Sequence, residues 1–211
     1  MGREFMHIFD EWAESYNATV QGHDEQYQAV FESYDQILSN VAERATGVTI
    51  EFGIGTGNLT EKLLQQEVDL IAIEPNKNMR QLAANRFPAL TIHDGDFIKF
   101  PKVAKVDTVV SSYAFHHLTD DEKRRAFELY TPLLSRNGQI VFADTMFENE
   151  KKHEDMIQQA KAKGHLALAD DLSREYYTTV PTMKRLLHET GYQVQFEQLN
   201  DFVWLTHAKK I

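Results

Sequence analysis

Three glycines at alternate positions, Gly53, Gly55 and Gly57, are the strongest chemical signal in the sequence. They follow a short β-rich run, Val48–Phe52, and precede a helical pattern that begins near Leu59. Because glycine has no Cβ atom, such a turn can bend tightly and can let a ligand lie directly against the backbone. The turn is therefore the first candidate for a binding site.

The residues after the last glycine disfavour two common phosphate sites. A phosphate loop needs Lys followed by Ser or Thr at this place, but Asn58 follows Gly57. A dinucleotide fingerprint needs a third glycine at Asn58 or at Thr60, depending on the register, and neither position has one. The helix after the turn is therefore less suited to a pyrophosphate.

A carboxylate, Glu74, ends the second β-rich run, Leu70–Ile73. The two oxygens of one carboxylate can accept hydrogen bonds from both hydroxyls of a ribose, so this position favours a nucleoside-containing ligand. Nicotinamide enzymes also carry glutamate at this place, so Glu74 alone does not identify the ligand.

His116 and His117 are the candidate catalytic residues, and they follow the fourth β-rich run, Val106–Ser111. An imidazole near a transferred group can take a proton from a hydroxyl, a thiol or an amine. Capping or packing is the other role open to this pair. We expect no metal site here, because adjacent residues do not easily face one ion and no carboxylate stands at ligand spacing.

Alternating elements must position these residues. Five β-rich runs, at 48–52, 70–73, 90–93, 106–111 and 139–143, alternate with helical patterns. Asn76 and the pair Thr119 and Glu122 are predicted to cap two of the helices, and the second of these helices is expected to end at Asn137-Gly138. This order predicts a mostly parallel sheet with helices on both faces, which binds ligands at the carboxyl ends of its strands.

The two ends of the chain depart from this order. Residues 1–45 are predicted to form an N-terminal helical cap, with one helix carrying apolar residues from Tyr27 to Val41, and residues 146–180 a helical insertion. Two last runs, at 192–199 and 202–207, are separated by Asn200-Asp201, which predicts a hairpin and hence an antiparallel strand. We interpret residues 1–211 as a single domain.

Composition excludes several classes of function. The chain has 211 residues and a formal net charge of −10, which disfavours nucleic acid and anionic membranes as partners. It has no cysteine, so disulfides, thiolate metal sites and cysteine nucleophiles are ruled out. The start of the chain shows no signal-peptide pattern, and no apolar run approaches the ~18 residues that span a bilayer, so we expect a cytoplasmic protein.

The segment Glu51–Gly57 resembles the first motif of the class I S-adenosylmethionine (SAM) dependent methyltransferases, acidic-x-Gly-x-Gly-x-Gly. The segment Phe9–Tyr16 is similar to the opening of the small bacterial YrrT-like methyltransferases, and later motifs follow in order. The resemblance implies a Rossmann-like fold with a mostly parallel seven-stranded sheet and an antiparallel C-terminal strand.

The resemblance also implies the cofactor-binding residues and the reaction. Asp96 would face the adenine amino group, and Phe97 would cover the ring or pack in the core. Ser111, Ser112 and Tyr113 would line the methionine end. The predicted cofactor-binding residues are Glu51, Gly53, Gly55, Gly57, Glu74, Asp96, Phe97, Ser111 and, from the N-terminal segment, Tyr16. Methyl transfer from SAM to a small-molecule acceptor leaves S-adenosylhomocysteine (SAH).

Two other functions stay open at this stage. A nicotinamide-dependent oxidoreductase would use the same sheet, although the missing fingerprint glycine opposes it. A protein that binds SAM without catalysis would keep the same cofactor residues. The sequence specifies neither the acceptor nor the oligomeric state.

Overall fold

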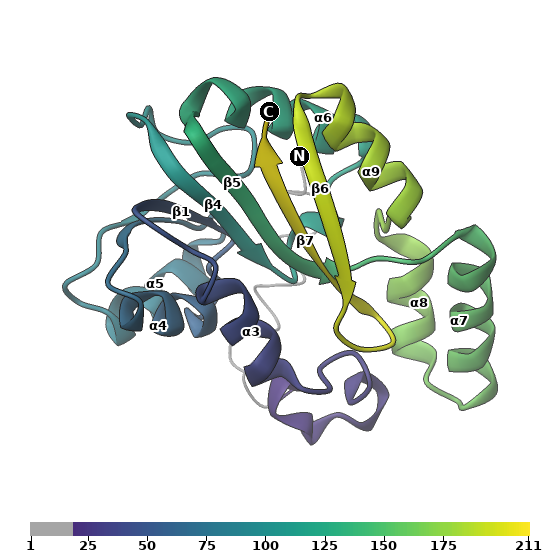
Figure 1. Ribbon diagram of the computed structural model, residues 1–211. Coiled ribbons are helices and arrows are strands. Elements are labelled where there is room, and N and C mark those ends of the chain that lie inside the picture. The colour runs from purple at the N-terminus through teal and green to yellow at the C-terminus, as the bar shows by residue number, and fades with distance from the viewer. Residues whose placement is uncertain (1–18) are drawn as a thin grey trace.

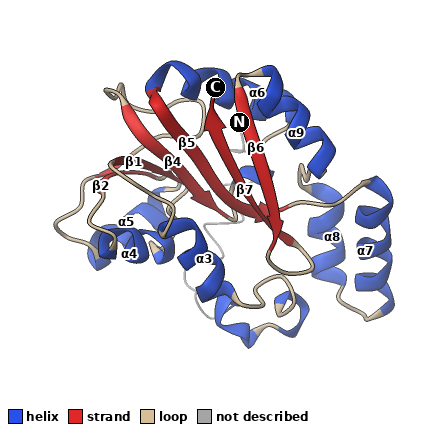
Figure 2. Cartoon of the chain, viewed as in Figure 1, coloured by secondary structure: helices blue, strands red, loops and turns tan. Residues whose placement is uncertain are grey.

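The computed structural model describes residues 19–211, so the predicted contact of Tyr16 lies outside the described residues. Seven strands form one sheet in the order β3-β2-β1-β4-β5-β7-β6 (Figures 1 and 2). The strands are β1 (Val48–Phe52), β2 (Asp69–Ile73), β3 (Ile92–His93), β4 (Val106–Ser112), β5 (Leu134–Thr145), β6 (Tyr192–Gln198) and β7 (Val203–Lys210).

Strands β1 to β5 pair in parallel, whereas β7 runs antiparallel to both of its neighbours, β5 and β6. The helical elements between 19 and 211 are η2 (Thr19–His23), η3 (Glu25–Tyr27), α3 (Tyr34–Ala42), α4 (Asn58–Gln65), α5 (Lys77–Arg86), η4 (Phe115–His117), α6 (Asp120–Leu133), α7 (Glu150–Ala162), α8 (Leu166–Arg174) and α9 (Val180–Glu189). The predicted fold class, with its antiparallel C-terminal strand, is confirmed. None of the helices in this part of the chain is long and apolar enough to cross a membrane.

Alternate residues of the central strands pack against helices on opposite faces of the sheet, as the two-residue period of a strand requires. Val110 and Val141 join a core with α3, α4, α7 and α8. Val109 and Ile140 join a second core with α6 and α9. Since both faces of the central strands are covered, the residues that face the helices are mostly apolar. The carboxyl ends of these strands are where polar side chains can meet a ligand.

Local signals placed several elements correctly. The side chain of Asn76 accepts hydrogen bonds from the backbone N–H groups of Asn78 and Met79 and caps α5. Thr119 and Glu122 form the predicted capping box at the start of α6. The loop between β6 and β7 completes the expected hairpin.

Two predicted helix boundaries are wrong. The helix expected from Tyr27 onward begins only at Tyr34, because Ser33 adopts a left-handed conformation with φ 60° and interrupts it. Helix α6 ends at Leu133, and Asn137-Gly138 lies inside β5 rather than in a turn before it. The pairing of β4 with β5 is irregular at this point, so Gly138 lies in a β-bulge and does not end a helix.

The helical hairpin of α7 and α8 lies beyond the carboxyl end of β5, shown in green in Figure 1. Phe147 pairs with Thr179 in a short parallel bridge, so both ends of this segment stay close to the sheet. The segment between α8 and α9 therefore lies next to η4, which follows β4.

Candidate functional site

A cavity lies at the carboxyl ends of β1, β2 and β4, where a parallel sheet is expected to bind ligands. Its volume is about 870 Å³, with solvent at its mouth included. Residues from the glycine turn, the end of β2, the segment after β3, the end of β4 and helices α3 to α5 line it. The cavity therefore combines five separate parts of the chain.

The three glycines of the turn meet three different requirements. A Cβ atom on Gly53 would lie 2.9 Å from the Cβ of Ala114, and one on Gly57 would overlap the ring of Phe87. Gly55 differs, because a Cβ there would meet nothing within 4 Å. Gly55 lines the cavity with φ +56°, so its backbone forms a bare part of the cavity wall.

Glu74 also lines the cavity, and its residue is 5% exposed. Its carboxylate accepts hydrogen bonds from the backbone N–H of Gly55, at 2.8 Å, and of Asn76, at 2.7 Å. Burial raises the pKa of Glu74 to about 7, although these two donors lower it in part. The predicted carboxylate and the predicted glycine are therefore in direct contact.

Asp96 and Phe97 both line the cavity, but each is also part of the fold. Oδ1 of Asp96 accepts from the backbone N–H groups of Ile98 and Lys99 and closes a turn. The ring of Phe97 contacts the ring of Phe52 at a centroid distance of 5.3 Å. Phe97 thus packs in the core with one part of its surface at the cavity.

Three of the predicted cofactor-binding residues within the described chain, Gly57, Ser111 and Glu51, do not line this cavity. The hydroxyl of Ser111 donates to the backbone carbonyl of Phe52, 2.9 Å away. Glu51 accepts from the hydroxyl of Thr60 at 2.7 Å, and burial raises its pKa to about 8. The side chains of Ser111 and Glu51 thus contact Phe52 and Thr60, the residues that flank the glycine turn. At the end of β4, the cavity is lined by Ser112, Tyr113 and Ala114.

Sequence reasoning placed Tyr113 at the cavity but missed Tyr34, which completes an aromatic wall with it. Tyr34 at the start of α3 and Tyr113 after β4 both line the cavity, with ring centroids 5.4 Å apart. Asn58, the first residue of α4, donates to the hydroxyl of Tyr34 at 3.3 Å. Tyr34 belongs to the apolar pattern of the N-terminal region, so the only available signal was its helical spacing, which predicts packing.

The two histidines occupy different environments. His117 lines the cavity, and its Nδ1 lies 3.0 Å from the carbonyl oxygen of Ala114. Burial and the charge of His116 lower the pKa of His117 to about 4, so its ring is neutral at pH 7. His116 does not line this cavity, and its Nδ1 lies 2.5 Å from Oδ1 of Asp144.

Asp144 holds the turn that carries both histidines. Its carboxylate accepts from the backbone N–H groups of Phe115, at 2.5 Å, and His116, at 3.0 Å. Burial by itself would lower the pKa of His116, but Asp144 and Glu175 outweigh it and raise this pKa to about 10. His116 is therefore a cation at pH 7 and cannot act as a general base.

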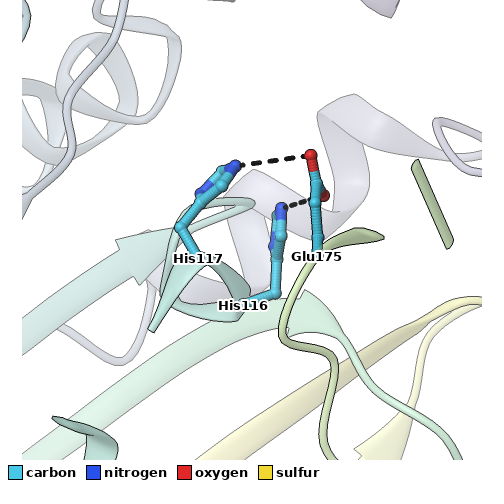
Figure 3. A group of neighbouring side chains, drawn as sticks. All are labelled: His116, His117 and Glu175. Atoms are coloured by element: carbon cyan, nitrogen blue, oxygen red, sulfur yellow. Dashed lines mark ion pairs between the residues drawn. The ribbon is translucent and has the colours of Figure 1, made fainter. Parts of the chain in front are cut away.

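Glu175, from the segment between α8 and α9, completes this cluster (Figure 3). Its carboxylate oxygens lie 3.3 Å from Nε2 of His116 and 3.8 Å from Nε2 of His117. The expectation that adjacent histidines do not easily face one point is wrong. No carboxylate stands at ligand spacing in the sequence, as expected, but a distant one reaches this point. The 3-10 turn η4 brings the two rings to a centroid distance of 4.1 Å, and the fold supplies the carboxylate from a distant segment.

The cavity fits the adenosyl group that the first motif implies. Gly55 leaves a stretch of wall that a side chain would fill, and the Glu74 carboxylate, a suitable acceptor for ribose hydroxyls, lies on the same wall. Apolar and aromatic residues, among them Leu59, Met79 and Phe97, supply most of the remaining surface.

Comparison with known proteins agrees with this geometry. A family model described as "Methyltransferase domain" matches residues 50–138, which include the glycine turn, Glu74 and both histidines. A curated protein of Anoxybacillus flavithermus, described as an uncharacterized methyltransferase, is 51% identical over 211 residues and is covered in full, as is this chain. One of Bacillus pumilus, with the same description, is 48% identical and covers 100% of this chain and 99% of its own length.

Two solved structures show the same fold at low sequence identity. The magnesium protoporphyrin IX methyltransferase of Synechocystis, solved with SAH, superimposes with a TM-score of 0.68 at 13% identity, over 97% of this chain and 99% of its own. The DhpI complex with SAH gives a TM-score of 0.68 at 15% identity, over 100% of this chain and 97% of its own.

Proposed function

Since the chain belongs to the class I SAM-dependent methyltransferases, we propose that the cavity at the glycine turn binds SAM and that a small-molecule acceptor is methylated beside His117. In this proposal Gly55 and Glu74 contact the ribose and its surroundings, and Asp96 faces the adenine. The methionine end would extend toward Tyr113 and Ala114, at the end of β4.

One observation carries this assignment. Gly55 and Glu74 come from the ends of two adjacent strands, touch each other at 2.8 Å and both line the cavity. A bare backbone beside a buried carboxylate is the combination that a ribose requires, because its two hydroxyls need acceptors and its ring needs close approach. Glu74 would contribute charge-assisted hydrogen bonds.

The chemistry places modest demands on the chain. Bound SAM supplies a methyl group on a positively charged sulfur, which a nucleophile displaces in line. The protein must align the acceptor and exclude water. Tyr34 and Tyr113 provide the aromatic wall for this task, and residues 1–45 with the insertion at 146–180 are proposed to cover the acceptor.

The two histidines have separate roles in this proposal. His117 presents a neutral ring at the cavity wall. The acceptor would lie next to this ring when it loses its proton. His116, held between Asp144 and Glu175, positions the turn. This division replaces the expectation that either histidine acts as base.

A crystal structure of the protein with SAH tests the assignment. We expect both ribose hydroxyls within hydrogen-bond distance of the Glu74 carboxylate and the adenine beside Asp96. SAH bound outside this cavity, or bound here with its ribose turned away from Glu74, would contradict it.

A further inference from the structure

The cluster of His116, His117 and Glu175 has the composition and spacing of a metal site. Each residue offers one ligand atom, and all three atoms lie within 4.8 Å of one another. Metal bonds of about 2.0–2.2 Å to imidazole nitrogen and carboxylate oxygen place neighbouring ligands about 3–3.6 Å apart. Oε2 of Glu175 lies 3.3 Å from Nε2 of His116, and Oε1 lies 3.8 Å from Nε2 of His117. These separations are close to this spacing, and the three ligand atoms would move slightly closer together around an ion.

Each of the three side chains has a separate partner that fixes its orientation. Nδ1 of His116 contacts Asp144, and Nδ1 of His117 contacts the carbonyl of Ala114. The hydroxyl of Tyr177 donates to Oε2 of Glu175 at 2.7 Å. In metal sites such partners typically hold the tautomer of the histidines and the direction of the ligands.

The hydrogen bond of His117 determines which nitrogen faces the carboxylate. A carbonyl oxygen only accepts, so Nδ1 of His117 carries the proton and Nε2 of the neutral ring carries the lone pair. Figure 3 shows Nε2 turned toward Glu175, whose Oε1 is also an acceptor. A cation placed between these two atoms has both of them as ligands.

We propose that His116, His117 and Glu175 bind a divalent first-row transition-metal ion such as Zn²⁺ or Fe²⁺ through two imidazole nitrogens and one carboxylate. The ion replaces the proton that Nε2 of His116 carries in its absence, and this proton is released to solvent. Two imidazoles favour these ions over Mg²⁺ and Ca²⁺, which prefer oxygen ligands. Three protein ligands leave coordination positions for a further group. His117 belongs both to this site and to the wall of the cavity.

The role of the ion rests on the proposed function, whereas its binding does not. A hydroxyl or thiol of the acceptor that coordinates the ion has a lowered pKa and releases its proton to solvent. Its oxygen or sulfur then forms a bond to the methyl carbon of SAM as the bond from that carbon to sulfur breaks. SAH leaves as a neutral thioether. Because the ion acts by coordinating a hydroxyl or a thiol, this role implies a small hydroxyl or thiol compound as the acceptor.

Metal binding is tested directly on the full chain after dialysis against a chelator. Titration with Co²⁺ should produce visible d–d absorption that saturates at one ion per chain, and Zn²⁺ should remove this absorption by competition. The variants His117→Ala and Glu175→Gln should bind Co²⁺ at least about tenfold more weakly. Mg²⁺ should not compete.

The matched control is His188→Ala, because His188 is exposed in α9 and outside the cluster. It should bind Co²⁺ as the wild type does. Glu175→Gln keeps an acceptor for Tyr177, and because it can lower stability by itself, the thermal shift caused by Zn²⁺ is compared within each variant. Wild-type-like Co²⁺ binding by Glu175→Gln and His117→Ala, or no stoichiometric binding by the wild type, would overturn the metal site.

A parallel titration with SAH separates this proposal from the proposed function. SAH binding without metal binding removes the metal site and leaves the cofactor assignment in place. Metal binding without SAH binding supports the metal site and removes the cofactor assignment.

Discussion

The backbone N–H of Gly55 donates to Oε2 of Glu74 at 2.8 Å and links the turn after β1 to the end of β2. The contact joins two adjacent parallel strands at their carboxyl ends. It sets the position of the carboxylate relative to the bare stretch of backbone, so the two features that a ribose needs are held at a fixed distance.

Glu74→Gln is expected to weaken SAH binding by about ten- to a hundredfold, because the ribose hydroxyls lose a charged acceptor worth about 1.5–3 kcal/mol. Isothermal titration calorimetry measures the effect. Glu128→Gln, the same substitution at an exposed glutamate of α6 that does not line the cavity, serves as the control and should bind SAH as the wild type does. Equal affinity for wild type and Glu74→Gln would remove Glu74 from the site.

The affinity for SAH should depend on pH through Glu74. Burial raises the pKa of Glu74 to about 7, and binding favours the ionised carboxylate because ribose hydroxyls donate to it. Affinity should therefore rise by up to about tenfold per pH unit as the pH increases toward 7, and level off above it. The charges that act on this carboxylate are Glu51, Arg80 and Asp94.

Titrations of SAH between pH 5.5 and 8.5 measure this dependence, and the variant Glu74→Gln is the comparison. The variant should show a flatter profile, since its amide does not ionise. A wild-type profile that matches the variant, or one that falls as pH rises to 7, would show that the carboxylate does not control binding.

Asp144→Ala should lower the free energy of unfolding by about 3–5 kcal/mol, because it removes the nearer of the two carboxylates that pair with the buried imidazolium of His116. It also removes the acceptor of three backbone N–H groups, those of Phe115, His116 and Thr145. Urea unfolding in the presence of a chelator measures the loss. Asp201→Ala, at an exposed acid, should leave stability unchanged, and an equally small loss for Asp144→Ala would mean that the turn holds without it.

Lys123→Met tests how the insertion is held to η4. The ammonium of Lys123, whose residue is 1% exposed, donates to the carbonyls of Leu118 and Tyr176. Methionine fills similar volume but leaves both carbonyls without this donor, which should cost about 2 kcal/mol or more. Limited proteolysis should then cut residues 163–179 faster than in the wild type.

The control for this variant is Lys151→Met, since Lys151 forms an exposed pair with Asp155 on α7. Its proteolysis and unfolding should match the wild type. Should Lys123→Met behave in the same way, other contacts must hold the segment between α8 and α9.

Local signals account for the part of the site that sequence alone predicted. The bounds of β1 were read correctly, and the glycine turn and Glu74 stand at strand ends, which apolar runs mark clearly. Ser111, Ser112 and Tyr113 were all placed at the cavity, but β4 extends to Ser112 and the chain then turns at Tyr113, whose φ is 50°. Ser112 and Tyr113 line the cavity together with Ala114, whereas Ser111 does not.

The remaining features depend on contacts between distant segments. Glu175 stands in a polar stretch without a recognisable motif, and only the packing of the insertion beside η4 brings it to His116 and His117. Tyr34 has the spacing of a core residue, and its place at the cavity follows from where α3 begins. Periodicity reports which face of a helix is apolar, but not what that face meets.

The binding of SAH to Gly55→Val, measured by calorimetry beside the wild type, tests the cofactor site most directly. Gly164→Val is the matched control, because Gly164 also has a positive φ and open space around its Cβ, but lies between α7 and α8. Both variants carry similar backbone strain, so only a side chain at the cavity wall separates them. The account predicts binding by the wild type and Gly164→Val and a loss of at least about a hundredfold in Gly55→Val. Wild-type affinity in Gly55→Val would contradict it.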